Sequence, residues 1–366
     1  MRPPGSGLRT ANLRWRLTAT LLAAVALGSC GGDSSSAPSG PTRSFLMGFS
    51  AIPPRPDPDI VVPGIDRWDD RADAAIMHVS PRWDALLDGI PAADVVEALE
   101  LPLAALYRAR GMELVFVVDP TNGLDRSADA PELVARGRSI TEPAIQDLYR
   151  EWAGEVAAQL PPDWLGLVAE TNLIRAAAPA PVYQALVTMA NAAAAEIDAA
   201  GIDTRLFVSV QVEVAWGRPA GPYAGIAQDL ADFPFVEALG LSSYPYLSGF
   251  SDPEDIPLEY YGRVGQGTSL PLLVVEGGWR SKPVGAVALS PEMQRRYIER
   301  QAELLEEAGA RAVFQRTFFD LDLAAIPELP GSALSLFANL GLADVDMNPK
   351  PALEPWDDVF SRPYRP

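Results

Sequence analysis

The sequence predicts an α/β protein whose folded part is one (β/α)8 barrel of the TIM type. Three observations predict it. Short apolar runs alternate with longer amphipathic runs, the pattern of strands and helices around a parallel sheet. Eight strand-like runs can be counted. No internal change of composition divides the chain after residue 44, and a barrel of this class can hold about 320 residues in one domain.

The predicted strands are short, rich in β-branched and other apolar residues, and without charge in their interiors, as expected of strands buried on both faces. They cover Phe45–Phe49, Ala74–Val79, Glu113–Val118, Leu165–Ala169, Leu206–Val212, Ala238–Ser242, Leu272–Val275 and Ala312–Gln315.

Amphipathic runs between these strands predict the helices. They cover Ala92–Arg110, Glu142–Leu160, Val182–Ala200, Pro291–Ala308 and Ser332–Leu340, with a first helix around Ile60–Arg71. Gly111, Gly201 and Gly309 follow three of these runs, where glycine commonly ends a helix. A doubly wound open sheet is the alternative, but its first strand usually leads into a glycine-rich turn. Here the first strand leads into a proline-rich loop, Ala51–Pro56.

The first 44 residues predict export and anchoring rather than fold. Four arginines precede an apolar run, Leu17–Leu27, and the small residues after it end at Cys30, the one cysteine of the chain. This pattern resembles a bacterial lipoprotein signal over residues 1–29, with Cys30 as the lipidated residue; an ordinary signal peptide is the alternative. Residues 30–44 are rich in Gly, Ser and Pro and are expected to be a flexible tether. The barrel domain then covers residues 45–366, on the outer membrane or the cell surface.

Net charge and composition limit the classes of partner that the chain is expected to bind. The chain has a formal net charge of −19. Without residues 1–29, which carry four arginines and no acid, the charge is −19 − 4 = −23. Such a surface disfavours nucleic acids and anionic polymers, so a neutral partner and a monomer are expected. One histidine, His78, and no cysteine in the folded part disfavour a His- or Cys-rich metal site. We expect no metal and no cofactor.

Two carboxylates end apolar strands in similar settings. Glu276 follows Leu270–Val275 and precedes two glycines, and Glu170 follows Leu165–Ala169. In an eight-stranded barrel the fourth and seventh strands face each other across the mouth, where the chemistry of this fold lies. Two opposed carboxylates suit glycoside hydrolysis, with one as general acid and the other as nucleophile or base. A carboxyl separation of about 5–5.5 Å is expected, the spacing of a retaining enzyme.

Other polar and aromatic residues follow the predicted strands, and the aromatic ones offer flat faces that can stack on sugar rings. The predicted substrate-binding residues are Asn172, Glu213, Trp216, Tyr244, Trp279 and Arg316.

Gly240–Tyr246, followed by Val274–Trp279 and by the ending Gly341–Leu353, resembles the last strands of clan A glycoside hydrolases. Among these the family 53 endo-β-1,4-galactanases are the most similar, followed by family 5. The resemblance implies a (β/α)8 barrel and a retaining glycosidase, with Glu170 as acid/base, Glu276 as nucleophile and Tyr244 as partner of the nucleophile. An oligo- or polysaccharide with neutral β-linked sugars is the implied substrate.

Two other functions remain open. Clan A enzymes have Asn before the acid/base and a Trp after the eighth strand, whereas this chain has Ala169 and Arg316. These departures favour a carbohydrate-binding lipoprotein on a barrel without catalysis. A lyase or a metal-dependent hydrolase using Asp119, Glu170 and Glu213 is the third hypothesis.

Overall fold

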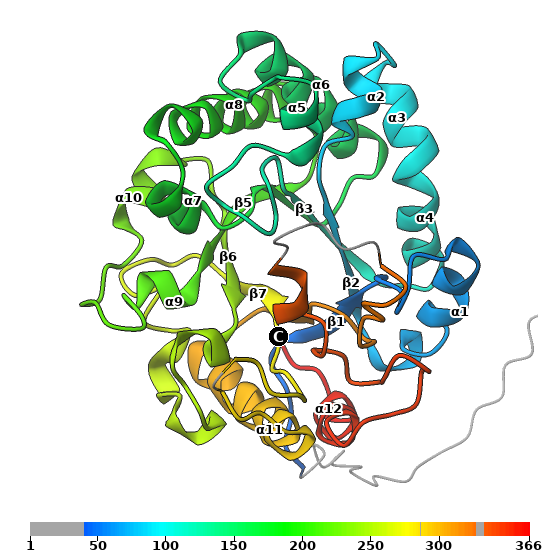
Figure 1. Cartoon of the computed structure of the whole chain (residues 1–366), viewed down its shortest axis with the longest axis vertical. Coiled ribbons are helices and arrows are strands. Elements are labelled where there is room, and N and C mark those ends of the chain that lie inside the picture. The colour runs from blue at the N-terminus through cyan, green and yellow to red at the C-terminus, as the bar shows by residue number, and fades with distance from the viewer. Residues whose placement is uncertain (1–39, 286, 327–332) are drawn as a thin grey trace, which may run out of the picture. The chain divides into compact units, whose positions relative to one another are not determined.

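The computed structural model of the chain describes residues 40–285, 287–326 and 333–366. Eight parallel strands in these ranges close into a barrel in sequence order, with β8 pairing back to β1. Helices surround the strands (Figure 1), and Pro41–Pro366 form one compact unit. The predicted (β/α)8 barrel is confirmed. Cys30, the signal over residues 1–29 and most of the expected tether lie outside the described residues.

The strands agree with the predicted runs to within two residues. They are β1 (Leu46–Ser50), β2 (Ala74–Val79), β3 (Glu113–Val118), β4 (Trp164–Val168), β5 (Arg205–Gln211), β6 (Ala238–Ser243), β7 (Leu272–Gly277) and β8 (Ala312–Gln315).

The helices differ more from the expected ones. They are α1 (Val61–Ile65), α2 (Trp83–Leu87), α3 (Ala92–Leu99), α4 (Leu101–Ala109), α5 (Pro131–Ala135), α6 (Pro143–Gln159), α7 (Thr171–Ala177), α8 (Ala180–Ala199), α9 (Val212–Ala215), α10 (Ala227–Asp232), α11 (Pro291–Ala308) and α12 (Leu353–Phe360). Of the helices that the structure describes, none has the length and apolar character needed to cross a membrane.

Three helix predictions need correction. Ala92–Arg110 is two helices, because Pro102 lies in the first turn of α4, where its missing N–H and fixed φ favour a helix start. The expected first helix is a five-residue α1 flanked by 3₁₀ turns at Pro58–Ile60 and Asp69–Arg71. The expected helix Ser332–Leu340 is a 3₁₀ turn, Ala333–Leu336, in its described part.

The buried apolar side chains form two groups, one inside the barrel and one between the strands and the helices. Phe207 fills the inside at the level of Gly166 and Gly240, whose missing side chains make room for its ring. A Cβ at Gly166 or Gly240 would lie 2.7 or 2.8 Å from that ring. The barrel is therefore closed below its mouth by packed side chains.

Two irregularities of the sheet come just before the two predicted catalytic residues. The register between β4 and β5 shifts between Gly166 and Val168. The register between β6 and β7 shifts so that Ser242 pairs with Glu276 instead of Val275. A bulge changes the face to which the following side chains point. Strict alternation would turn Glu276 away from the barrel axis, because Val275 lies inside. The shift therefore brings Glu276 to the mouth.

Candidate active site

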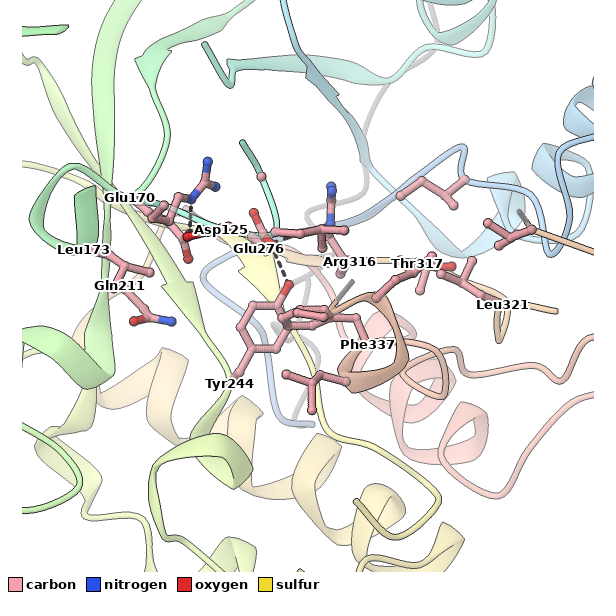
Figure 2. A pocket seen from close by; sticks show the side chains of 18 of the residues that line it. Asp125, Glu170, Leu173, Gln211, Tyr244, Glu276, Arg316, Thr317, Leu321 and Phe337 are labelled. Carbon is pink, nitrogen blue, oxygen red and sulfur yellow. Dashed lines mark hydrogen bonds and ion pairs between the residues drawn. The ribbon is translucent and has the colours of Figure 1, made fainter. Parts of the chain in front are cut away.

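A cavity of about 570 Å³ opens at the carboxyl ends of the strands, and both Glu170 and Glu276 line it (Figure 2). Its other lining residues come from the loops after β1, β3, β4, β5, β6 and β8 and from the segment around Ala333–Leu336. The volume lies within the range of pockets that hold small ligands. This is the face on which the barrel fold was expected to place its chemistry.

Glu276 lies on β7 with polar groups on both carboxylate oxygens. Its Oε1 accepts a 2.7 Å hydrogen bond from the Tyr244 hydroxyl and lies 3.6 Å from Nε of Arg316. Its Oε2 lies 3.6 Å from Nδ1 of His78. Gly278 then adopts φ 145°, a conformation that favours glycine. The expected sharp turn after the carboxylate is therefore present, as is the expected contact with Tyr244.

Glu170 lies at the start of α7 in the left-handed backbone region, with φ 52° and ψ 47°. A non-glycine residue there is strained by roughly 1–3 kcal/mol and needs support from its surroundings. Its N–H donates to Ser209 Oγ at 2.9 Å, and its Oε1 accepts from Ser242 Oγ at 2.6 Å. Burial is the main cause that raises the pKa of Glu170, and the nearby charge of Glu276 adds to it, against the effect of Arg126.

Arg126 is a site residue that the sequence did not reveal. Its Nε donates to Glu170 Oε2 at 2.8 Å, and its Nη1 donates to Asp119 Oδ1 at 2.5 Å and to Thr121 Oγ1 at 3.2 Å. Burial lowers the pKa of Arg126, but the carboxylates around it raise it above its usual value overall. In the sequence Arg126 belongs to a polar loop, Asn122–Ser127, in which an arginine normally points to solvent.

The site holds one more carboxyl group than it has cations. Arg126 and Arg316 are two cations, and Asp119, Glu170 and Glu276 are three carboxyl groups connected to them by hydrogen bonds or close approach. Uncompensated charge is costly in such a place. Burial raises the pKa of Glu170, and a raised pKa is what a general acid needs.

His78 lies beside Glu276 as a neutral side chain. Burial, followed by the charge of Arg316, lowers its pKa to about 3. Its Nε2 lies 2.9 Å from the Val275 carbonyl oxygen, which assigns the ring proton to Nε2 because a carbonyl can only accept. Nδ1 then faces Glu276 without a proton. The part of the chain that the structure describes contains no serine hydroxyl bonded to this ring, so no Ser–His–Asp arrangement forms there.

Glu213 lies behind Tyr244 and outside the cavity lining, which corrects its predicted role as a substrate ligand. Its Oε1 accepts from the Tyr260 hydroxyl at 2.6 Å, the Tyr244 N–H at 2.8 Å and the Ser243 hydroxyl at 3.1 Å. Its Oε2 is buried without a hydrogen-bond partner in the described part of the chain. Burial raises the pKa of Glu213 to about 7, although these donors lower it. Glu213 thus fixes the backbone from which the Tyr244 ring extends.

The two tryptophans predicted to stack on sugars do not line the cavity. Trp279 is 0% exposed and stacks on Tyr297 with ring centroids 5.2 Å apart. Trp216 donates its indole N–H to the Tyr260 carbonyl at 2.9 Å, and the Arg263 guanidinium covers its ring. The prediction was wrong for both residues, because apolar aromatic faces near the rim are better buried by protein than left open.

Asn172 is likewise buried and used by the protein. Its amide donates to the Gln211 carbonyl at 2.9 Å and accepts from the Gln211 N–H at 2.8 Å. The predicted ligand is therefore a support, and the residue that it supports, Gln211, lines the cavity. Gln211 and Ser242 were not predicted as site residues. Both lie on the inward-pointing side of predicted strands, and this position could have indicated them from the sequence.

The third hypothesis from the sequence required a metal site formed by Asp119, Glu170 and Glu213. Among the described residues no group of three His, Cys, Asp or Glu side chains is placed to hold a metal ion. The Arg126 guanidinium bonds to both Asp119 and Glu170, and Glu213 bonds to Tyr260 and Ser243 instead.

Comparison with known proteins places this site in context. No family model matches the chain, and no curated protein matches it in sequence. Solved structures do match in fold. An exo-β-1,4-mannosidase from Opitutaceae bacterium strain TAV5 is 16% identical with a TM-score of 0.63, over 87% of this chain and 59% of that one. A β-glucuronidase from Ruminococcus gnavus in complex with uronic deoxynojirimycin is 15% identical with a TM-score of 0.54, over 87% and 50%.

A third match is Bacteroides uniformis β-glucuronidase 2 covalently bound to cyclophellitol-6-carboxylate aziridine, 14% identical with a TM-score of 0.58, over 87% of this chain and 35% of that one. The chain thus spans between about a third and three fifths of the length of these structures. The specific likeness to family 53 stays a prediction. With the closed barrel of parallel strands, these matches show that the chain has the (β/α)8 barrel fold, which it shares with these glycosidase structures.

Proposed function

We propose that the chain is a retaining glycosidase that cleaves a neutral β-linked glycoside, with Glu276 as nucleophile and Glu170 as acid/base. One observation carries the proposal: two carboxyl groups, one buried and one partly buried, line one cavity at the barrel mouth in different surroundings. Glu276 accepts from Tyr244 beside Arg316, and Glu170 has a raised pKa. Pairs of carboxyl groups whose surroundings separate their pKa values are typical of glycosidases.

In the first step Glu276 attacks the anomeric carbon. The bond from that carbon to the leaving oxygen breaks, and the proton of Glu170 goes to the leaving oxygen. Tyr244 holds Oε1 of Glu276, which leaves Oε2, beside the unprotonated Nδ1 of neutral His78, as the oxygen that attacks. The site has one more carboxyl group than it has cations, and the pKa of Glu170 is raised. Both support a protonated Glu170 before this step.

In the second step Glu170 acts as base. The glycosyl–enzyme ester removes the negative charge of Glu276, and this charge is one cause of the raised pKa of Glu170. The pKa of Glu170 therefore falls when the ester forms, while Arg126 continues to favour its carboxylate. Glu170 then takes a proton from water, the water oxygen bonds to the anomeric carbon, and Glu276 leaves.

Two polar side chains that line the cavity can hold the sugar. Arg316 brings the guanidinium that lies 3.6 Å from Glu276, and a sugar hydroxyl can accept a hydrogen bond from it. The Gln211 side chain reaches the same cavity (Figure 2).

The experiment is hydrolysis of a panel of 4-nitrophenyl β-glycosides by the wild type, Glu276→Gln and the control Glu259→Gln, an exposed glutamate outside the cavity. We expect Glu276→Gln to lose at least about a thousandfold in kcat, because no ester can form, and Glu259→Gln to resemble the wild type. Early product of the wild type should be the β-anomer in nuclear magnetic resonance spectra. An α-anomer, or full activity of Glu276→Gln, contradicts the mechanism.

One observation favours the second candidate, a carbohydrate-binding protein without catalysis. Both oxygens of Glu170 already accept hydrogen bonds, from Ser242 and from Arg126. Binding of an oligosaccharide with no turnover of any activated glycoside supports this candidate.

We further propose that Cys30 is lipidated, that residues 31–44 tether a monomeric barrel to the outer membrane or cell surface, and that the enzyme acts outside the cytoplasm. The position of Cys30 after Leu17–Leu27 and small residues supports this proposal.

A further inference from the structure

The walls above the two carboxylates are apolar, although the floor is polar. Gln211 and Glu276 lie at the ends of β5 and β7, and Glu170, Tyr244 and Arg316 closely follow β4, β6 and β8. With Arg126, which bonds to Glu170, they form the polar floor. Leu124 and Leu173 come from the loop after β3 and from α7. Leu321, Ile326, Leu336 and Phe337 come from the segments that follow β8. In Figure 2, Leu173 lies on one side of Glu276, and Leu321 and Phe337 lie on the other.

Hydrogen bonds hold the wall that follows β8 in place. The Leu336 carbonyl accepts from the Tyr246 hydroxyl at 3.0 Å, and the Ser335 carbonyl accepts from Arg280 at 2.5 Å. Leu321 N–H donates to the Ala338 carbonyl at 2.7 Å, which joins the two parts of this wall. The Asp322 N–H donates a 2.7 Å hydrogen bond to the carbonyl of Pro54, which lies in the loop after β1. The aliphatic side chains therefore face the cavity from anchored backbone.

Such walls fit poorly around a second sugar. A sugar unit brings several hydroxyl groups, and each one loses its water without a partner when it lies against aliphatic carbon. Sugars also bind to the flat faces of aromatic rings. Among the described lining residues the aromatic ones are Tyr244 and Phe337, and these two pack on each other in a T-shape, 4.8 Å apart. The charged side chains Arg55 and Asp125 are exposed at the rim.

We infer that the substrate is a β-glycoside of an apolar alcohol, whose sugar lies on the polar floor and whose aliphatic or alicyclic aglycone lies between the apolar walls. This inference rests on the proposed function and narrows its substrate class, because a further sugar of an oligo- or polysaccharide would place hydroxyl groups against the apolar walls. Hydrolysis breaks the bond between the anomeric carbon and the leaving oxygen. Water supplies the hydroxyl of the sugar, and the apolar alcohol leaves with the proton from Glu170.

The kinetic test uses the sugar that is cleaved fastest as its 4-nitrophenyl glycoside. For that sugar, kcat/KM is compared for the methyl, butyl and octyl β-glycosides, below micelle-forming concentrations, and for the β-1,4-linked disaccharide. Each added CH2 that is buried should lower KM by up to about fourfold. We expect the octyl glycoside to exceed the methyl glycoside and the disaccharide by at least about tenfold. Equal or better cleavage of the disaccharide overturns the inference.

The variants Leu173→Gln and Leu321→Gln place a polar group in opposite walls. Each should lower the octyl-to-methyl ratio of kcat/KM about tenfold through KM. Leu323→Gln is the matched control, since Leu323 lies two residues from Leu321, is 39% exposed and does not line the cavity. An unchanged ratio in both wall variants, with thermal melts like that of the wild type, also overturns the inference.

A binding measurement separates this inference from the proposed function. The fluorescence of N-phenyl-1-naphthylamine, a neutral apolar probe, should rise with wild type and Glu276→Gln and fall when octyl β-glucoside displaces it. Probe binding that is lost in Leu173→Gln and Leu321→Gln but kept in Leu323→Gln supports the apolar site even if no glycoside is cleaved. Cleavage of aryl glycosides without probe binding leaves the proposed function standing and contradicts the apolar site.

Discussion

Arg126 and Glu170 are joined by a buried hydrogen bond in which Nε of Arg126 donates to Oε2 of Glu170 at 2.8 Å. The side chains are 6% and 7% exposed. Burial raises the pKa of the proposed acid and the charge of Glu276 adds to this effect, whereas Arg126 lowers the pKa. The balance keeps the proton of Glu170 removable in the second step of the reaction.

Replacement of Arg126 by Gln should raise the pKa of Glu170, because the cation that favours its carboxylate is lost. The alkaline limb of the kcat/KM profile requires protonated Glu170, so it should move to higher pH. The unfolding free energy should fall by about 3–5 kcal/mol at pH 8, where Asp119 and Glu170 lose their shared cation. The control Arg136→Gln, an exposed arginine paired with Asp84 and Asp88, should keep the limb in place. A shift to lower pH contradicts the assignment.

Glu170→Ala should depend strongly on the leaving group. A substrate that leaves as 4-nitrophenolate needs little protonation, so its first step should slow far less than that of an alkyl glycoside. The second step lacks its base, and added azide should restore part of the turnover as a glycosyl azide. The measurement is the azide dependence of kcat together with product analysis. Equal losses for both leaving groups and no azide effect argue against an acid/base role.

The Glu213→Gln variant should become more stable relative to the wild type as pH rises. The pKa of Glu213 is raised from 4.5 to about 7 in the folded chain. The folded state therefore keeps its proton longer than the unfolded state and loses stability as pH rises from 4.5 to 7. Gln has no such titration, so the variant should gain roughly 2–3 kcal/mol on the wild type between pH 5 and pH 8. Urea unfolding at the two pH values measures this gain, and a constant difference would mean that Glu213 is ionised.

His78→Gln should remove a loss of folding stability that the wild type shows as pH falls. The pKa of His78 is about 3 in the folded chain against 6.5 ordinarily. Below pH 6.5 the unfolded chain binds a proton that the folded chain does not, so the wild type loses stability as pH falls. The loss through this group should be about 2 kcal/mol between pH 7.5 and pH 5. The variant should lack it in the same unfolding measurements, whereas parallel curves would mean that folding does not lower the pKa of His78.

Cys30→Ser tests the anchor. In the bacterial host the wild-type chain should remain with membranes after a high-salt wash and should gain mass from acyl chains at Cys30. The variant should appear in the soluble extracytoplasmic fraction, because a lipid chain adds apolar area that the protein itself does not supply. Ser35→Ala serves as the control in the same segment. A variant that stays bound after the wash places the attachment elsewhere.

The sequence determined the barrel and the position of its two carboxylates. Strands buried on both faces appear as short apolar runs whatever their neighbours are, so Ala74–Val79, Glu113–Val118 and Ala312–Gln315 have their predicted bounds. Glu170 and Glu276 could be found because a charge that ends such a run lies at the mouth of the barrel. Tyr244 followed from its place after the sixth strand and does bind Glu276.

The tertiary structure decided which other residues reach the site. Arg126 enters it because two buried carboxylates need a cation, a demand created only when the loops after β3 and β4 meet. Three predicted residues do not reach the site, because protein groups distant in sequence cover or bond to them. Tyr297 stacks on Trp279, Gln211 bonds to Asn172, and Tyr260 bonds to Glu213. A local sequence pattern indicates whether a side chain lies near the end of a strand. Whether that side chain meets ligand or protein depends on what the rest of the chain packs against it.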